Sequence, residues 1–377
     1  MADPSLTIGI EEEYMLVHPE TGELATDPPP DLPERCAKRC SGMVSPEFLR
    51  SQIEIGTPVA KNIKEAAQML KEMRNAVIEE STKVGLAPIA ASTHPFAKWY
   101  KQKYTAKERY DELNKNLQAA ARRLLTCGMH VHVGVEDNEL RIDFMRQAAY
   151  LLPHLLALST SSPFWESANT GLKCYRLTVF AGMPRTGLPE YFASWGEYQR
   201  HVQVMIDTGQ IEDETHIWWD QRASARYPTL ETRIMDVCSL VEDAVALAAL
   251  NQCILHMLNH LRKRNVRWRI YSRMLIDQNR WRAIRYGIDE GLVDWGCAEL
   301  LPFDKLLDEL IDIVMPDAEA LDCVDEIQSA RKILERGTSA HRQVAIYDEK
   351  IAAGKPKQVA LVSVVQQLIE ETKKDCS

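Results

Sequence analysis

Three consecutive glutamates in an otherwise apolar segment are the first residues of this chain whose types and spacing could do chemistry. They stand in IGIEEEYMLV, residues 8–17. A β-strand turns alternate side chains to opposite faces, so Glu11 and Glu13 would share one face and Glu12 would interrupt the apolar other face. Two carboxylates side by side repel each other and usually persist by sharing a proton or a cation. Taken alone, this pair favours solvated charges at the edge of a sheet, and a binding site becomes the prediction only because later segments repeat the pattern.

Three later segments repeat this alternation of polar and apolar side chains. Each is short, rich in Val, Ile or Leu at every second position, and therefore typical of a strand with one buried face. Their polar residues are Glu47, Arg50, Gln52 and Glu54 in or just before LRSQIEIGT (49–57), His130 and His132 in CGMHVHVGV (127–135), and Glu231 and Arg233 in RYPTLETRIMD (226–236).

The simplest arrangement is one sheet whose apolar face packs on helices and whose polar face is a site. So many carboxylates in one cleft would stay partly protonated unless cations were present. Oxygen ligands with one imidazole suit Mg²⁺ or Mn²⁺, and no cysteine accompanies them as a structural zinc site would prefer. The predicted metal ligands are Glu11, Glu13, Glu47, Glu54, His130 and Glu231.

Arginines in the same segments predict that the site also handles phosphate. Carboxylates with arginines, but without a nucleophile-and-base motif, suggest metal-held phosphates whose transferring group is clamped by guanidinium groups. The chain has no G-x-x-x-x-G-K-[ST] loop and no G-x-G-x-x-G that opens a helix after a strand, so metals and arginines on a sheet would have to hold any nucleotide. The arginines concerned are Arg50, Arg176, Arg222, Arg226 and Arg233.

The elements that must position these residues follow an α+β order. Besides the four strands, residues 87–92 read as a short buried strand, and residues 62–84, 107–125, 139–158 and 189–208 read as helices. From residue 239 onward the chain reads as almost wholly helical. Such an order fits an antiparallel sheet with helices packed behind it. We expect one domain over 1–377, sheet-rich in 1–236 and helical in 237–377.

Composition places the chain among ordinary globular proteins. It has 377 residues, 45% hydrophobic and 26% charged, with a mean hydropathy of -0.28 and a formal net charge of -9. The acidic balance argues against a nucleic-acid partner. No run suggests a membrane span, and the N-terminus lacks a signal-peptide pattern, so we expect a cytoplasmic protein. The nine scattered cysteines are expected to be reduced.

Taken together, the motifs resemble the carboxylate–amine ligases of the second glutamate–cysteine ligase family, which share a catalytic domain with glutamine synthetase. The resemblance extends over nearly the whole chain. Its motifs are GIEEEYMLV, IEIGTPV, STHPF, GMHVHVGV, LSTSSPFWES, TGLKCYR, RYPTLETRIMD and GTSAHRQ. Two residues depart from it, since Glu166 and Cys174 stand where a small or hydroxyl residue is expected.

The resemblance implies a glutamine synthetase-like fold, a curved antiparallel sheet that holds ATP with two or three divalent ions. It places Glu11, Glu13, Glu54, His130 and Glu231 as metal ligands, and Glu47 with a spacing that differs by one. Arg233 and Arg222 would steady the transferred phosphoryl group. The remaining substrate or nucleotide contacts would be Arg50, His132, Arg176, Trp218 and Arg226.

The reaction implied is acyl activation. The γ-phosphoryl group of ATP would pass to a substrate carboxylate, and an amine would attack the acyl phosphate to give an amide. Glutamate and cysteine are the family's reference pair, giving γ-glutamylcysteine, and small molecules are therefore the expected partners. We also expect a homodimer, because Val359–Ile369 carries apolar residues at helical spacing in excess of what one core is expected to bury.

Two other functions stay open at this point. A guanidino kinase would transfer phosphoryl groups on such a sheet, but it should lack the imidazole of GMHVHV. A metabolite sensor could be built on a ligase fold, since fold does not determine function, but it would not need every charge of the cluster.

Overall fold

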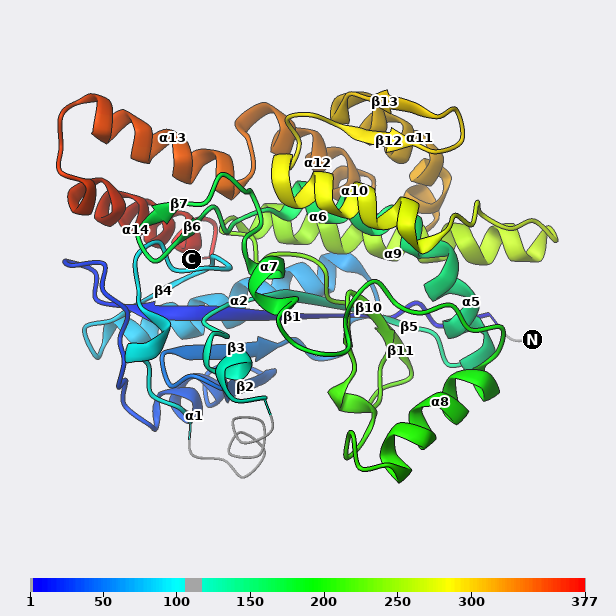
Figure 1. Cartoon of the computed structure of the whole chain (residues 1–377), viewed down its shortest axis with the longest axis horizontal. Helices are drawn as coiled ribbons and strands as arrows, with labels where there is room; N and C mark the ends of the chain where they lie inside the picture. Colours follow the sequence, from blue (N-terminus) through cyan, green and yellow to red (C-terminus); the bar gives the residue numbers. More distant parts are fainter. Residues whose placement is uncertain (1–2, 106–116, 377) are drawn as a thin grey trace.

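A seven-stranded antiparallel sheet lies at the centre of the protein (Figure 1). The computed structural model describes residues 3–105 and 117–376. The strands follow the order β10-β11-β5-β1-β3-β2, and β4 also pairs with β1. They are β1 (Ile8–Val17), β2 (Met43–Pro46), β3 (Gln52–Gly56), β4 (Ala87–Ile89), β5 (Met129–Gly134), β10 (Gln221–Ala223) and β11 (Thr229–Thr232).

The register of β1 brings the predicted acidic positions beside those of its neighbours. Glu11 lies opposite His130 of β5, and Glu13 lies opposite Glu54 of β3. Along β1 the side chains alternate as predicted, since Ile8, Ile10 and Tyr14 are buried while the two glutamates are partly exposed. One strand therefore sets the positions of ligands on both sides of it.

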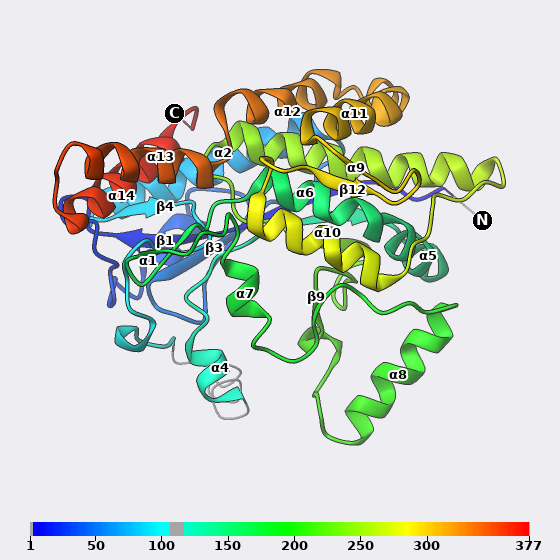
Figure 2. The same ribbon diagram turned by 45° about the horizontal axis from the view of Figure 1, so that its top comes forward.

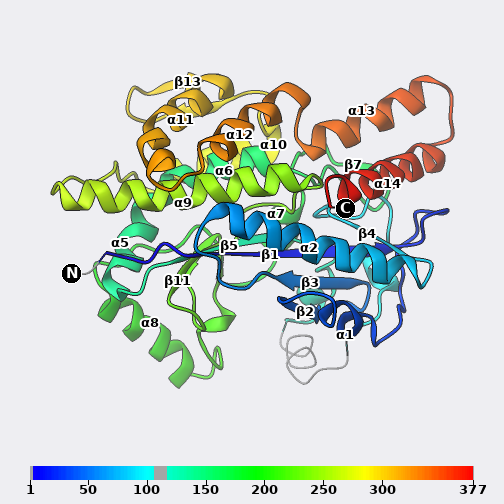
Figure 3. The same cartoon turned by 180° about the vertical axis from the view of Figure 1, so that it is seen from behind.

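Helices cover the apolar face of the sheet. Seen from behind in Figure 3, α2 (Ile63–Thr82) and α9 (Val241–Lys263) lie across this face. α2 contacts β1 and β4, α9 contacts β5, and the two helices also contact each other. The buried apolar residues form one continuous cluster from Leu6 to Cys376, so the sheet and its helices share a single core.

The remaining elements surround this two-layer centre. Figure 2 shows α4, α7 and α8 on the side of the sheet away from the long helices. The other helices are α1 (Leu32–Ala37), α4 (Ala119–Arg122), α5 (Asn138–Ala148), α6 (Leu152–Ser159), α7 (Arg176–Phe180), α8 (Trp195–Asp207), α10 (Arg273–Tyr286), α11 (Phe303–Ala320), α12 (Val324–Arg336), α13 (Ser339–Ala352) and α14 (Lys357–Lys373), with short 3₁₀ turns at Trp99–Lys101, Ala149–Leu151 and Glu214–His216. Three small two-stranded sheets are β6 (Phe164–Trp165) with β7 (Ala168–Asn169), β8 (Thr186–Gly187) with β9 (Trp218–Trp219), and β12 (Leu292–Asp294) with β13 (Glu299–Leu301).

Glu12 has a structural partner that explains its place on the apolar face. Its carboxylate accepts hydrogen bonds from Arg74 of α2, at 2.7 Å from Nε and 2.6 Å from Nη2, and from the Tyr14 hydroxyl. Arg74 also donates to the carbonyl oxygens of Cys238 and Ser239, at 2.8 and 3.1 Å. Both charged side chains are fully buried. This ion pair therefore ties the first strand to α2 and to the chain that leaves β11.

Some element boundaries differ from those predicted. The strand expected over 49–57 spans only Gln52–Gly56, and it pairs with β2, which the sequence did not predict. The helix expected over 107–125 falls partly outside the described residues, and the described remainder contains α4. The helix expected over 189–208 begins only at Trp195, because Ser194 caps it by accepting from the backbone N–H of Glu197.

α9 is the helix that bears on the expectation of no membrane span. Its length and hydropathy are sufficient for a membrane span, although none was expected. However, 89% of its apolar window is buried inside the protein. α9 is therefore a core helix that packs on the apolar face of the sheet.

The C-terminal helix also differs from what was expected of it. In α14 the apolar residues Ala360, Leu361, Val364, Val365, Leu368 and Ile369 are buried. α14 contacts α13, β4 and α2 of the same chain. Its apolar face is therefore covered without a second subunit and gives no support for a homodimer.

Candidate functional site

The polar face of the sheet forms one side of a cleft of about 540 Å³. This volume is in the range of small-molecule sites. All six predicted metal ligands line the cleft, together with six of the seven other predicted site residues. These are Glu11, Glu13, Glu47, Glu54, His130 and Glu231, and then His132, Arg176, Arg222, Arg226 and Arg233; Trp218 lines it as well.

Glu11 lies between the two histidines of β5. Its carboxylate is 3.1 Å from Nδ1 of His130 and 3.3 Å from Nε2 of His132. Burial alone would raise the pKa of Glu11, but the contacts with both imidazoles outweigh it and hold the pKa well below its ordinary value. Burial, together with the charge of Arg233, lowers the pKa of His130 to about 4. His130 is therefore a neutral imidazole near pH 7, which is the form that binds a metal.

His132 has a different environment from His130. Its Nδ1 is 2.9 Å from the hydroxyl oxygen of Thr229 on β11, and its ring meets that of Tyr227 edge to face, with centroids 5.9 Å apart. Burial would lower the pKa of His132, but the carboxylates of Glu11 and Glu231 raise it above its ordinary value. The negative charge around this ring is therefore greater than the positive charge.

The part of the cleft around β3 has an excess of negative charge. Burial, and then repulsion from Glu47, raises the pKa of Glu13 to about 8. Burial and the charges of Glu47, Glu11 and Glu13 likewise raise the pKa of Glu54 well above its ordinary value. Glu13 accepts from the backbone N–H of Gly128 at 2.8 Å, and Glu54 accepts from the Ser45 hydroxyl at 3.2 Å. Positive ions would relieve the repulsion in this part of the cleft.

At the other end of the cleft, arginines hold Glu231. Arg222 donates to it through Nε at 2.9 Å and Nη2 at 3.2 Å, and Arg233 donates through Nη1. Burial raises the pKa of Glu231, but the charges of Arg233 and Arg222 lower it below its ordinary value. Arg222 is further engaged by the carbonyl oxygens of Thr215 and Ile217. Nε of Arg233 is buried without a hydrogen-bond partner among the described residues, so it can still bind an anion.

The donor atoms are close enough to hold divalent cations. Three groups each bring one ligand atom per residue within 4.8 Å of one another. Glu11 and Glu54 each belong to two of them, so the groups form one connected cluster. The groups are Glu11–Glu54–His130, Glu11–His132–Glu231 and Glu13–Glu47–Glu54. Carboxylate oxygens with imidazole nitrogens fit Mg²⁺ or Mn²⁺, and His132, expected to contact substrate, is also at ligand distance.

The glycine of the GMH motif makes room for an arginine. A Cβ atom on Gly128 would lie 2.5 Å from Nη2 of Arg176, closer than real contacts allow. Arg176 donates to the carbonyl oxygens of Ile234 and Arg233, at 3.2 and 3.0 Å. Its guanidinium thus supports the end of β11, where Glu231 and Arg233 are placed.

Of the predicted substrate contacts, Arg50 lies outside the cleft lining, whereas Trp218 lies in it. Arg50 is not among its lining residues, and its Nη1 is 2.6 Å from a carboxylate oxygen of Asp27. Arg50 precedes β3, so the alternation of that strand does not extend to it. Trp218 does line the cleft, whereas Trp219 packs against the rings of Phe192 and Tyr198. Adjacent strand residues face opposite ways, so only one tryptophan reaches the site.

Several lining residues were not predicted. Ser45 lines the cleft and supports Glu54 from β2. Thr229 is not in the lining but supports His132 from β11. Their positions opposite or beside a predicted ligand follow from strand pairing, so a correct prediction of the β2–β3 hairpin would have indicated Ser45. The others carry no recognisable sequence pattern. Met43 lies in β2, Phe180 ends α7, Thr215 and His216 lie in a 3₁₀ turn, and the rest come from loops: Phe48, Leu124, Thr126, Met183, Ser224, Ala225 and Tyr227. Gln52 also lines the cleft.

The two residues that depart from the resemblance lie outside the cleft lining. Cys174 is buried and its thiol is 3.3 Å from Oδ1 of Asp236. Glu166 stands in the β6–β7 turn with a φ of 47° and is 4.0 Å from Nζ of Lys98. Their influence on the site would have to be indirect.

Comparison with known proteins identifies close relatives over the full length. The family model of glutamate–cysteine ligase family 2 matches residues 7–361. A protein of Rhodospirillum rubrum, provisionally named glutamate–cysteine ligase 2, is 54% identical over 99% of this chain and 97% of its own. A protein of Jannaschia sp. with the same provisional name is 51% identical over 98% of this chain and 97% of its own.

Solved structures show which fold this is. A bifunctional glutathione synthetase from Pasteurella multocida superposes with a TM-score of 0.67 at 14% identity, over 98% of this chain and 53% of the other. The glutamate–cysteine ligase of Francisella tularensis, solved in complex with AMP, also gives 0.67, at 12% identity over 98% and 90% of the two chains. The predicted glutamine synthetase-like fold is confirmed.

Proposed function

Because the chain belongs to glutamate–cysteine ligase family 2, we propose that it joins glutamate to an amine at the expense of ATP. With cysteine as the amine, the products would be γ-glutamylcysteine, ADP and phosphate. The observation that carries the proposal is the connected cluster of carboxylates and imidazoles beside Arg222 and Arg233. We further propose that the whole chain acts as one domain in the cytoplasm.

Two or three Mg²⁺ or Mn²⁺ ions are the cofactors that the cluster fits. Glu13, Glu47 and Glu54 would hold one ion, and the groups around Glu11 would hold the others. When bound, such ions neutralise the oxygens of ATP phosphates and of the transferring group. The raised pKa values of Glu13 and Glu54 fit this role, since both carboxyls lack positive partners sufficient to ionise them.

The first step would be phosphoryl transfer to the substrate. An oxygen of the γ-carboxylate of glutamate forms a bond to the γ-phosphorus of ATP. The bond from that phosphorus to the bridging oxygen breaks, and its electrons leave with ADP. Negative charge builds on the equatorial oxygens of the group in flight. The free Nε of Arg233 is a donor suited to them.

The second step would form the amide. The amine nitrogen attacks the carbonyl carbon of the acyl phosphate, the carbon–oxygen bond to phosphate breaks, and phosphate leaves as the nitrogen loses a proton. The lining residues that the structure describes offer carboxylates, imidazoles and arginines, but no feature that selects a thiol. Turnover with cysteine is therefore proposed to be slow, and another amine could serve better.

The two arginines beside Glu231 would have different roles. Arg222 uses its donors on Glu231 and on the carbonyl oxygens of Thr215 and Ile217, so it is a positioning residue for Glu231. Arg233 retains a buried donor without a partner, so it would contact the phosphoryl group. The Arg233→Lys substitution should therefore lower kcat more than Arg222→Lys does.

The experiment that tests the ligase proposal is positional isotope exchange. ATP carrying oxygen-18 in the β,γ-bridge is incubated with Mg²⁺, the enzyme and glutamate, without an amine. If an acyl phosphate forms reversibly and ADP can rotate before reversal, the label moves from the bridge to non-bridging positions, which phosphorus NMR detects. Scrambling that requires glutamate is the expected result.

Controls separate the ligase from other uses of the same site. Glu231→Gln should abolish the scrambling, and a panel of amines that includes cysteine should raise ADP release from the wild type. If neither scrambling nor amine-dependent ADP release occurs with any carboxylate, while ATP still binds, the ligase proposal fails and a metabolite sensor takes its place.

A further inference from the structure

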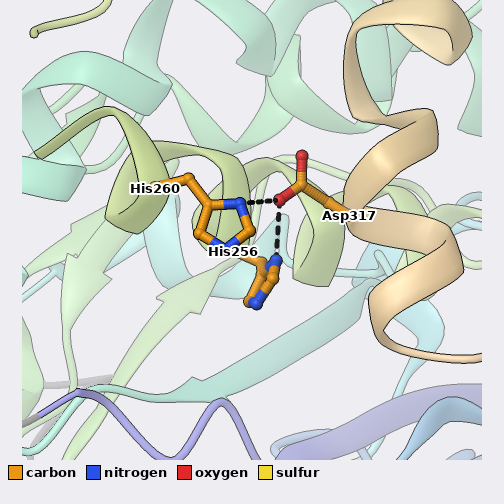
Figure 4. A group of neighbouring side chains, drawn as sticks. All are labelled: His256, His260 and Asp317. Carbon is orange, nitrogen blue, oxygen red and sulfur yellow. Dashed lines mark hydrogen bonds and ion pairs between the residues drawn. The ribbon is translucent and has the colours of Figure 1, made fainter. Parts of the chain in front are cut away.

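A second cluster of metal-ligating side chains lies outside the cleft. His256 and His260 stand one helical turn apart on α9, so their side chains share one face of the helix. Asp317 projects toward them from α11, which packs on α9 (Figure 4). None of the three residues lines the cleft, so the proposed ligase chemistry does not use them.

Both imidazoles contact the same carboxylate oxygen of Asp317. Nδ1 of His256 is 2.7 Å from Oδ1 of Asp317, and Nδ1 of His260 is 3.0 Å from the same oxygen. Figure 4 shows both imidazoles turned toward the carboxylate. The ring centroids are 4.3 Å apart with an interplanar angle of 62°. One ligand atom from each residue therefore faces a common point.

The charge balance at Asp317 favours a cation at this point. Its side chain is only 4% exposed, and an ionised carboxylate at such a place needs a compensating positive charge. Over residues 3–105 and 117–376, its ion-pair partners are the two histidines, with no lysine or arginine among them. Histidines are neutral unless they are protonated, so they are not permanent counter-charges.

We propose that His256, His260 and Asp317 bind one divalent cation of the zinc class. Two imidazole nitrogens with one carboxylate oxygen suit Zn²⁺ better than Mg²⁺, which prefers an all-oxygen shell. Bonds of about 2.0–2.1 Å in a tetrahedral shell separate ligand atoms by about 3.3 Å. The observed separations of 2.7 and 3.0 Å from Oδ1 need to widen by only a few tenths of an ångström.

The exposure of the three side chains suggests how the ion would enter. Asp317 is buried, His256 is 15% exposed and His260 is 46% exposed. The outermost ligand can therefore turn toward solvent and back, and water would complete the coordination shell. A bound ion would connect the last turns of α9 to α11. It would thus stabilise the packing of α11 on α9, the helix that contacts β5 of the sheet.

The test measures Zn²⁺ binding in the presence of a non-chelating reductant and of saturating Mg²⁺, which would occupy the metal sites proposed in the cleft. Equilibrium dialysis with elemental analysis compares the wild type with the His256→Gln/His260→Gln double variant. The wild type is expected to bind one more Zn²⁺ per chain than the double variant. Zn²⁺ should also raise the Tm of the wild type by several degrees and leave that of the double variant unchanged.

Matched variants distinguish this site from other histidines and from the cleft. His201→Gln removes an exposed helical histidine whose Nδ1 contacts only a backbone carbonyl oxygen in the described structure, and it should bind zinc like the wild type. Glu231→Gln, made in the cleft, should keep the additional ion.

A milder variant covers the case in which the double variant does not fold. His260→Gln changes a half-exposed residue and should weaken Zn²⁺ at least tenfold without altering the circular dichroism spectrum. If the wild type, His260→Gln and the double variant bind the same number of zinc ions with the same affinity, the cluster is only a hydrogen-bonded network and the inference is overturned.

Discussion

The buried pair Glu12–Arg74 allows a sharp prediction about how β1 is held. Removing one partner leaves the other as an uncompensated buried charge, which typically costs 3–5 kcal/mol. Both side chains are fully buried and joined by two hydrogen bonds of 2.6 and 2.7 Å. We therefore expect Glu12→Gln to lower the free energy of unfolding by about 3–5 kcal/mol, a large part of the 5–15 kcal/mol typical of a domain.

The two single variants should differ in their dependence on pH. In Glu12→Gln the unpaired group is a guanidinium, which does not lose its proton, so the loss should be the same at pH 5 and pH 8. In Arg74→Met the unpaired group is a carboxyl, which can take up a proton and become neutral. An acid that binds its proton more tightly when folded gains stability as pH falls, so the loss should be smaller at pH 5.

Urea unfolding followed by circular dichroism measures these losses, and ATP turnover at low temperature checks the site. Glu12 faces away from Glu11 and Glu13, so each folded molecule of Glu12→Gln should keep metal-dependent activity. The double variant Glu12→Leu/Arg74→Met should lose less than the sum of the singles. A loss below about 1 kcal/mol in both singles would refute the assignment of this pair as the brace of β1.

Three further outcomes are expected. Glu54→Gln or Glu231→Gln should abolish Mg²⁺-dependent ADP formation with the fold intact, and full turnover in excess chelator would contradict the metal site. His130→Ala should reduce ATP turnover more than His132→Ala, measured as kcat at saturating Mg²⁺; equal and negligible losses would leave both residues structural. Burial lowers the pKa of His94 to about 4, so the folded protein binds a proton at His94 less readily than the unfolded chain does. The free energy of unfolding should therefore fall by roughly 3 kcal/mol between pH 6.5 and 4. Urea unfolding of His94→Asn should lack this pH-dependent loss.

Alternation along strands accounts for what the sequence predicted well. Because the side-chain period of a strand is two, the faces of Glu11, Glu13, His130 and Glu231 could be assigned without coordinates. Once each strand had one polar face, a shared sheet was the arrangement that buried every apolar face. The positions of the ligands then followed from register, which the structure gives as Glu11 opposite His130 and Glu13 opposite Glu54.

What the sequence did not predict depends on partners distant in the chain. Arg74 lies mid-helix, and nothing local indicates that its partner is Glu12, 62 residues earlier. His94 is a second case, since its Nδ1 accepts from the N–H groups of Phe96 and Ala97 while Nε2 faces the carbonyl oxygen of Gly22. Its neighbours therefore establish a structural role that a His-Pro sequence leaves open.

The charges of the cleft also suggest an order of binding for the proposed reaction. Around Glu231 the carboxylate is already compensated by two arginines, whereas burial, and then the charge of Glu47, raise the pKa of Glu13 to about 8. Phosphate oxygens brought to this second group would add negative charge to an uncompensated region. In the proposed reaction, divalent cations would therefore enter there before or together with ATP, because they would compensate the carboxyl groups and give a polyphosphate a surface that it can approach.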